Sequence, residues 1–201
     1  MTAVHDHSTQ VEQSLAESAR VIAGLWAQRA AIVLIGNELM HALKHGGKVL
    51  TAGNGGSAAE ALHMAEELVG RFQANRPALA AVALVADSTA LTCIGNDFGF
   101  DAIFSRQVEA LGRPGDVLVL FSTSGQAANL SHALAAAQAK GLKTVCLLGR
   151  DGGKLAGRAT HELIVRHQDT ARIQEAHQVL LHVLLEIIES AFPAAPHGKT
   201  A

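Results

Sequence analysis

The sequence predicts an α/β fold in which crossover helices connect the strands of a parallel sheet. After residue 46, short runs rich in Val, Leu and Ile alternate with longer helical patterns, which is typical of such folds. Two of these runs lead through a turn rich in Gly or Ser directly into a helix. The length of 201 residues fits one domain, and we find no internal repeat or linker. We therefore expect a single domain over residues 1–192.

Two amphipathic helices are expected before the sheet. In residues 10–27, apolar side chains recur every three or four positions from Val11 to Leu25. A second pattern of this kind runs from Ile32 to Leu43 and ends at a Gly-Gly pair, a typical helix stop. Residues 1–45 are thus expected to form an N-terminal helical segment.

Five short apolar runs predict the strands of the sheet, and the helical patterns between them predict the connections. The expected strands are Lys48–Ala52, Ala81–Val85, Asp116–Phe121, Lys143–Leu148 and Glu162–Arg166. The expected helices cover residues 57–72, 88–94, 101–111 and 127–139, followed by a long closing helix from Ala171 to Ala191. Residues 193–201 have the composition of a disordered tail.

Composition argues against several functional classes. The formal net charge is −2 and no long run of Lys or Arg occurs, so the charge pattern of a nucleic-acid-binding protein is missing. There is no Tyr and few aromatic residues to stack on bases. The N-terminus has no features of a secretion signal, and the longest apolar helical stretch, Val179–Ile188, is too short to span a bilayer. We expect a cytoplasmic protein with no nucleic-acid or membrane partner, in which Cys93 and Cys146 are buried free thiols.

Two turns that follow expected strands have the composition of phosphate-binding loops. Gly53-Asn54-Gly55-Gly56-Ser57 leads into a helix, whose unpaired N–H groups and positive dipole end attract anions, although a tight connection would also use glycines. Ser122-Thr123-Ser124-Gly125 precedes the helix that contains Asn129, and an ordinary N-cap would explain only one of its three hydroxyls. Walker and GxGxxG motifs are absent, which favours a phosphorylated metabolite over a nucleotide.

Two of the expected helices carry side chains that could bind a metal. His63 and Glu67 are four positions apart and therefore project from one helix face, one turn apart. The closing helix has Gln174 near its start and His182 within an aliphatic run, where a histidine is more often a satisfied core residue. Imidazoles, a carboxylate and an amide oxygen together form a mixed ligand set suited to zinc or a similar divalent ion.

Four segments resemble the phosphoheptose isomerases, which are members of the sugar isomerase (SIS) fold. The segments are GNGGSAAEALHMAEELVGRF, IGNDFGFDAIFSRQVEALG, STSGQAAN and RIQEAHQVLLH, in this order within about residues 46–191. The resemblance implies a three-layer sandwich with a five-stranded parallel sheet, assembled as a homotetramer. It also implies an aldose–ketose isomerase that converts sedoheptulose 7-phosphate to D-glycero-D-manno-heptose 7-phosphate, the first step towards nucleotide-activated heptose.

The resemblance assigns roles to individual residues as well. The family's metal ligands, for one divalent ion of which Zn²⁺ is the expected one, match His63, Glu67, Gln174 and His182. Glu67 also matches the family's base and His182 its acid. The substrate contacts match Asn54, Gly55, Gly56, Ser57, Asn96, Asp97, Ser122, Thr123, Ser124 and Gln174. Ala127 stands where many members have a further hydroxyl, which leaves three hydroxyls in the second loop.

Two alternatives concern the activity and the assembly of the site. A non-catalytic SIS-domain protein, of the kind that associates with the bacterial replication initiator, could bind a sugar phosphate or a protein partner, but the full ligand set favours the enzyme. Gln174 and His182 are eight residues apart, which is about 12 Å along one helix. We therefore expect these two ligands to come from different chains, with His177 as the same-chain alternative.

Overall fold

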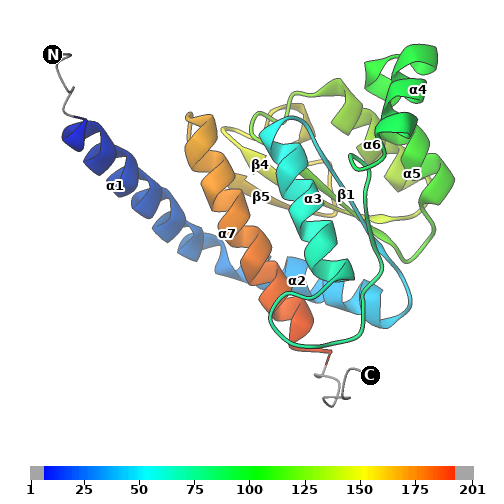
Figure 1. Cartoon of the computed structure of the whole chain (residues 1–201), viewed down its shortest axis with the longest axis horizontal. Coiled ribbons are helices and arrows are strands. Elements are labelled where there is room, and N and C mark those ends of the chain that lie inside the picture. The colour runs from blue at the N-terminus through cyan, green and yellow to red at the C-terminus, as the bar shows by residue number, and fades with distance from the viewer. Residues whose placement is uncertain (1–6, 193–201) are drawn as a thin grey trace, which may run out of the picture.

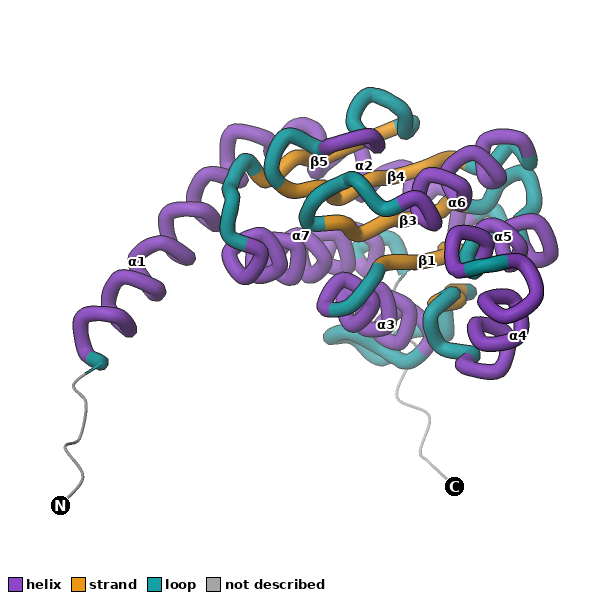
Figure 2. The backbone as a smooth tube through the Cα atoms, turned by 90° about the horizontal axis from the view of Figure 1, so that it is seen from above, coloured by secondary structure: helices purple, strands orange, loops and turns teal. Residues whose placement is uncertain are grey.

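A five-stranded parallel sheet with helices on both faces forms the body of the protein (Figure 1). The structure is a computed structural model and describes residues 7–192, so the expected tail at 193–201 lies outside the described residues. The first helix projects from this body, and Figure 2 shows it extending away from the sheet on the side of the closing helix. The architecture confirms the expected α/β fold with a five-stranded parallel sheet.

The strand order places the two expected phosphate loops next to each other. The strands are β1 (Val49–Gly53), β2 (Ala81–Ala83), β3 (Val117–Ser122), β4 (Lys143–Gly149) and β5 (His161–Val165). They pair in the order β2-β1-β3-β4-β5, and all pairs are parallel. Gly53 at the end of β1 is in register with Phe121 near the end of β3. The loops that follow β1 and β3 therefore begin at the same edge of the sheet.

The helices form two layers, and each layer covers one core cluster. They are α1 (Ser8–Gly24), the 3₁₀ turn η1 (Leu25–Gln28), α2 (Arg29–Lys44), α3 (Gly56–Val69), α4 (Ser88–Phe98), η2 (Phe100–Ala102), α5 (Ser105–Leu111), α6 (Ala128–Ala139), η3 (Gly153–Leu155) and α7 (Thr170–Glu189). α2, α3 and α7 cover one face of the sheet, and α5 and α6 cover the other. Every residue of β1 and β3 is buried, as expected for strands covered on both faces.

The segment around α4 differs from the expectation. The helix begins at residue 88 as expected, where the Asp87 carboxylate accepts hydrogen bonds from Thr89 N and Ala90 N, but it continues beyond 94 to Phe98 and ends at Gly99, which has a positive φ of 83°. None of its residues is buried, so Cys93 is exposed and the prediction of a buried thiol there is wrong. Cys146 on β4 is buried as expected, and this burial raises the pKa of its thiol to about 12.

Two further elements have different bounds from those expected from the sequence. The strand expected over 81–85 ends at Ala83, since β2 is an edge strand and the chain turns after it, although Leu84 N still donates to Thr51 O at 2.8 Å. The helix expected over 101–111 is divided between η2 and α5.

Among the described residues, the N-terminal helical segment Ser8–Lys44 is the one long and apolar enough to be a candidate membrane span, rather than the stretch Val179–Ile188 considered from the sequence. By length and composition alone its 37 residues could cross a membrane, with a mean hydropathy of 1.4 in the most apolar window. A core helix passes the same test, and in α2 the side chains of Ile35 and Leu39 are fully buried. Other apolar side chains of the segment are exposed in the single chain: Val11, Leu15, Trp26, Val33 and Leu34.

Candidate active site

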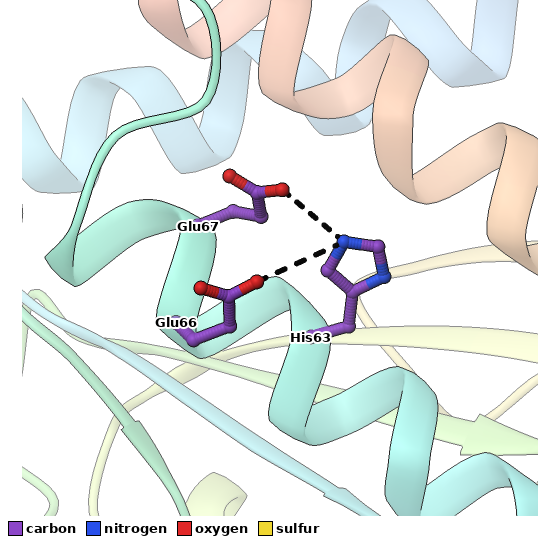
Figure 3. Close-up of side chains that lie close together, drawn as sticks. All are labelled: His63, Glu66 and Glu67. Carbon is purple, nitrogen blue, oxygen red and sulfur yellow. Dashed lines mark hydrogen bonds and ion pairs between the residues drawn. The ribbon is translucent and has the colours of Figure 1, made fainter.

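The first part of the candidate site lies on α3, where a histidine faces two carboxylates (Figure 3). His63 Nε2 lies 3.2 Å from Glu67 Oε1 and 3.9 Å from Glu66 Oε1. Potential ligand atoms of the three side chains all lie within 4.8 Å of one another, a spacing that could accommodate a metal ion. His63 and Glu67 are the expected pair. Glu66 was not expected, although its spacing of three residues from His63 on a helix is a signal for it.

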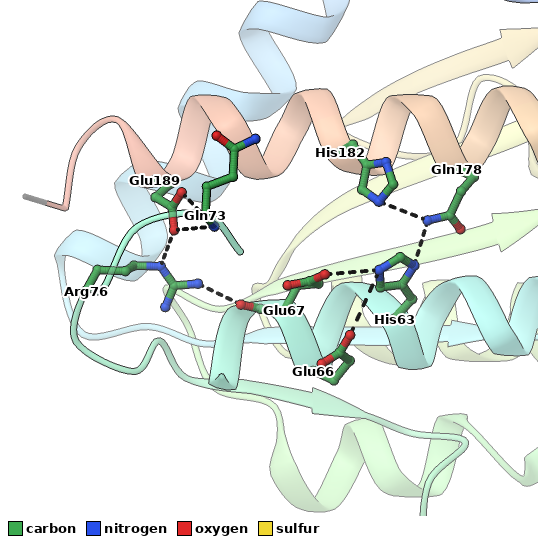
Figure 4. Close-up of polar contacts among 8 residues, drawn as sticks. All are labelled: His63, Glu66, Glu67, Gln73, Arg76, Gln178, His182 and Glu189. Atoms are coloured by element: carbon green, nitrogen blue, oxygen red, sulfur yellow. Dashed lines mark hydrogen bonds and ion pairs between the residues drawn. The ribbon is translucent and has the colours of Figure 1, made fainter. Parts of the chain in front are cut away.

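The second part of the site comes from α7, which runs beside α3 (Figure 4). The rings of His63 and His182 are 5.2 Å apart between centroids. The Gln178 carboxamide lies between them, with its nitrogen 2.6 Å from His63 Nδ1 and 3.2 Å from His182 Nε2. Gln178 was not expected at the site, but it stands four residues after Gln174 and four before His182, on the same helix face.

Gln174 and His182 lie on the same helix α7, so the separation of eight residues that favours ligands from different chains is retained. α7 of the same chain brings His182 next to His63, and Gln174 of that chain rests on the first turn of α3. A methyl group added at Gly56 would meet Gln174 Nε2 at 2.1 Å. Gln174, His63 and Gln178 also line one pocket of about 540 Å³. One chain therefore brings His63, Glu67 and His182 together, whereas the place of Gln174 in the ligand set stays a prediction.

His177, the same-chain alternative to His182, belongs to the core instead. The His177 side chain is fully buried, with a relative exposure of 0%. Its Nε2 lies 3.2 Å from the carbonyl oxygen of Leu148, and its Nδ1 lies 3.7 Å from Glu60 Oε2. Because both ring nitrogens face buried groups of the core, we exclude His177 from the candidate ligand set.

The two expected phosphate loops are joined by a pair of side-chain amides. Asn54 Nδ2 donates to Asn129 Oδ1, and Asn129 Nδ2 donates to Asn54 Oδ1, both at 2.9 Å. In the second loop, Ser122 Oγ accepts from Gly125 N at 3.0 Å and Ser124 Oγ accepts from Gln126 N at 3.3 Å. These oxygens stabilise the turn as acceptors, and each hydroxyl also has a hydrogen that it can donate.

The second loop depends on Gly125, and we expect Gly125→Ala to lower the free energy of unfolding by about 3 kcal/mol. Gly125 has φ +62°, and a Cβ there would lie 1.9 Å from the carbonyl oxygen of Gly152, so the backbone would have to move. Gly157→Ala is the matched control, because Gly157 has φ +73° with nothing within 4 Å of its Cβ position. In urea unfolding, Gly157→Ala should lower the free energy of unfolding by only about 1 kcal/mol, which is the cost of a positive φ for alanine. Equal losses in the two variants would show that the contact with Gly152 is unimportant.

Asn96 and Asp97, two expected substrate contacts outside the two phosphate loops, lie in the last turn of α4. Both are exposed, and Asn96 Nδ2 donates to Asp97 Oδ1 at 2.8 Å. The thiol of Cys93 lies 3.7 Å from Asp97 Oδ2. The sequence placed these two residues between helices, whereas the structure places them at the C-terminal end of α4. This helix is a different element from α3 and α7, which carry the His63 cluster.

A buried arginine that sequence reasoning missed fixes the C-terminal end of α3 (Figure 4). Arg76 Nη2 donates to the carbonyl oxygen of Glu67 at 2.7 Å, and Nη1 donates to that of Leu68 at 2.9 Å. Its Nε forms an ion pair of 3.3 Å with Glu189 Oε1, near the end of α7. Glu189 also accepts backbone hydrogen bonds from Gln73 and Ala74. Arg76 therefore ties the turn that bears Glu67 to the end of α7.

Comparisons with known proteins identify the family. The sequence matches the model of the SIS domain over residues 13–149. A phosphoheptose isomerase of Escherichia coli O139:H28 is 47% identical over 187 residues, which are 92% of this chain and 95% of that protein. The structure of a phosphoheptose isomerase from Neisseria gonorrhoeae superposes with a TM-score of 0.86 at 43% identity, covering 92% of this chain and 100% of that one.

A phosphoheptose isomerase from Francisella tularensis gives a TM-score of 0.88 at 33% identity, again over 92% of this chain and 100% of the other. Both the sequence and the fold therefore match these proteins over almost their whole length. With the His63–Glu67–His182 cluster and the paired loops in place, the chain belongs to the phosphoheptose isomerase family of SIS-domain proteins.

Proposed function

We propose that this protein converts sedoheptulose 7-phosphate to D-glycero-D-manno-heptose 7-phosphate, the first step of nucleotide-activated heptose biosynthesis. The observation that carries the proposal is the cluster of His63, Glu67 and His182 between α3 and α7. It supplies a carboxylate and imidazoles in a chain that is 47% identical to a phosphoheptose isomerase. The non-catalytic alternative would not need these groups to converge.

The reaction moves two protons, and the cluster has a group for each. Glu67 takes a proton from C1 of the ketose and returns it to C2, which is the work of a general base. His182 donates a proton to the carbonyl oxygen on C2 and receives the hydroxyl proton from the oxygen on C1. The product is the aldose, with both residues back in their starting protonation states.

The donor set fits a divalent cation, and we propose Zn²⁺ held by His63, Glu67, Gln174 and His182. The ligand atoms of His63, Glu66 and Glu67 lie within 4.8 Å of one another, and the His182 ring lies 5.2 Å from that of His63, a mixture of nitrogen and carboxylate donors that suits such an ion. When bound, the cation would polarise the substrate's oxygens and stabilise the negative charge that develops on them. Glu67 Oε1 is the oxygen that faces His63, which leaves Oε2 to act as the base.

The phosphate of the substrate is assigned to the second loop, with Asn54, Gly55, Gly56, Ser57, Thr123 and the α4 pair Asn96 and Asp97 as further substrate contacts. Ser124→Ala should mainly raise KM, by about tenfold, because the phosphate is bound alike in the ground and transition states. Ser190→Ala on the exposed end of α7 is the matched control and should leave KM unchanged. A fall in kcat at constant KM would contradict the assigned role of Ser124.

We also propose that the protein is a cytoplasmic homo-oligomer, with a tetramer as the expected state. The exposed apolar side chains of Trp26, Val33 and Leu34 support an association of this kind, since in the single chain they face solvent at 73%, 50% and 57%. Light scattering coupled to size-exclusion chromatography would measure the mass of the assembly. A monomer would contradict this part of the proposal.

An assay with sedoheptulose 7-phosphate and with fructose 6-phosphate tests the proposed activity most directly. We expect turnover of the heptulose phosphate, with the six-carbon ketose phosphate a poor substrate. If folded, Zn²⁺-loaded protein converts neither sugar, the result would contradict the proposed isomerase activity and favour the non-catalytic SIS-domain alternative.

A further inference from the structure

Gln178 makes a close polar contact between the two helices of the candidate site. Its side-chain nitrogen lies 2.6 Å from His63 Nδ1 and 3.2 Å from His182 Nε2, so one carboxamide touches both imidazoles (Figure 4). Gln178 is half-buried and lines the same pocket as His63 and Gln174. None of the roles given above to the site residues includes it.

The position of the hydrogen on the His63 ring determines which end of the Gln178 carboxamide can bind to it. His63 Nε2 faces the carboxylates of Glu67 and Glu66, which only accept hydrogen bonds, so Nε2 carries the hydrogen and Nδ1 presents a lone pair. The NH₂ group of Gln178 has two hydrogens and can donate one to His63 Nδ1 and one to His182 Nε2. Without metal, Gln178 therefore holds both rings in fixed orientations.

The same side chain can serve His63 when a cation is bound. Nε2 is the nitrogen beside Glu67, so a cation shared by these two residues would bind His63 through Nε2. The ring hydrogen would then be on Nδ1 and would require an acceptor, as the outer nitrogen of a metal-bound histidine generally does. A half-turn of the Gln178 carboxamide would present its oxygen to Nδ1, because the two ends of an amide have nearly the same shape.

We propose that Gln178 is a positioning residue of the metal site, which orients His63 with either end of its carboxamide and, with its NH₂ end, also contacts His182. The inference rests on the proposed Zn²⁺ site. Gln178 itself is not one of the proposed ligands but contacts two of them. The amide among the proposed ligands is that of Gln174, which lies against Gly56 on the first turn of α3.

Zn²⁺ affinity of the full chain, measured by competition with a chromophoric chelator, tests this role independently of activity. Gln178→Met keeps the length of the side chain but neither donates nor accepts as the amide does, and we expect it to weaken Zn²⁺ binding by about 10- to 100-fold. Gln178→Glu keeps an acceptor for Nδ1–H and should bind Zn²⁺ within about threefold of the parent or more tightly. Gln13→Met on the exposed face of α1 is the matched control and should not change the affinity.

A second measurement needs no variant and therefore still tests the inference if a substituted chain does not fold. Nitrogen chemical shifts of the His63 ring in the unchanged protein should place the hydrogen on Nε2 without zinc and on Nδ1 with zinc. Equal affinities of the parent and Gln178→Met, or equal weakening in the Met and Glu variants, would overturn the inference while leaving the zinc site intact. A parent chain that binds no Zn²⁺ would overturn the proposed metal site and this inference together.

Discussion

Glu67→Gln is expected to abolish isomerisation, with kcat lowered by about a thousandfold and the fold unchanged. The substitution keeps the shape of the side chain but removes the carboxylate that would accept the proton from carbon, and general base catalysis contributes about 10²- to 10⁴-fold. Steady-state rates with sedoheptulose 7-phosphate measure the effect, and circular dichroism confirms the fold. A rate within tenfold of the parent would exclude Glu67 as the base.

Glu66→Gln is the matched control for this prediction. Glu66 is the neighbouring residue on α3, but its side chain is 68% exposed and lies 3.9 Å from His63 Nε2, against 18% and 3.2 Å for Glu67. We expect the Glu66 variant to keep kcat within about threefold, since an exposed carboxylate at this distance contributes little. Zinc affinity measured on both variants separates loss of the base from loss of a ligand.

Arg76→Met is expected to lower the free energy of unfolding by about 4 kcal/mol, the largest stability effect that we predict. The Arg76 side chain is 1% exposed and that of Glu189 is 10%, so removal of the arginine leaves a nearly buried carboxylate without its cation. The carbonyl oxygen of Glu67 loses the hydrogen bond from Arg76 at the same time, and that of Leu68 keeps only the one from Leu79 N. For a chain of this length, the loss corresponds to a melting temperature lower by about 10 °C.

Two further variants show whether this loss comes from the unpaired charge. Arg106→Met removes an exposed arginine that lies over the Phe98 ring, and it should cost at most about 1 kcal/mol in urea unfolding. Adding Glu189→Leu to Arg76→Met should recover part of the stability, because the buried unpaired carboxylate is then gone. A loss below about 1 kcal/mol for Arg76→Met would mean that solvent or other groups satisfy Glu189 in its place.

The elements that the sequence predicted well are those defined by local periodicity. β1 and β3 are buried along their whole length, which favours runs made mostly of apolar residues, and such runs are visible in the chain. The His63–Glu67 pair was predictable because a spacing of four places both side chains on one helix face. The turns at Gly53–Ser57 and Ser122–Gly125 were predictable because few other sequences allow such close turns before a helix.

Contacts between distant elements were decided only by the tertiary structure. Gln178 reaches His63 across 115 positions and Glu189 reaches Gln73 across 116, and both contacts depend on how closely α7 lies beside α3. Cys93 has apolar neighbours in sequence, yet it is exposed because α4 lies on the surface. Local spacing specifies which side chains share a face of one helix, whereas the face of another helix that they meet is determined by packing across the whole core.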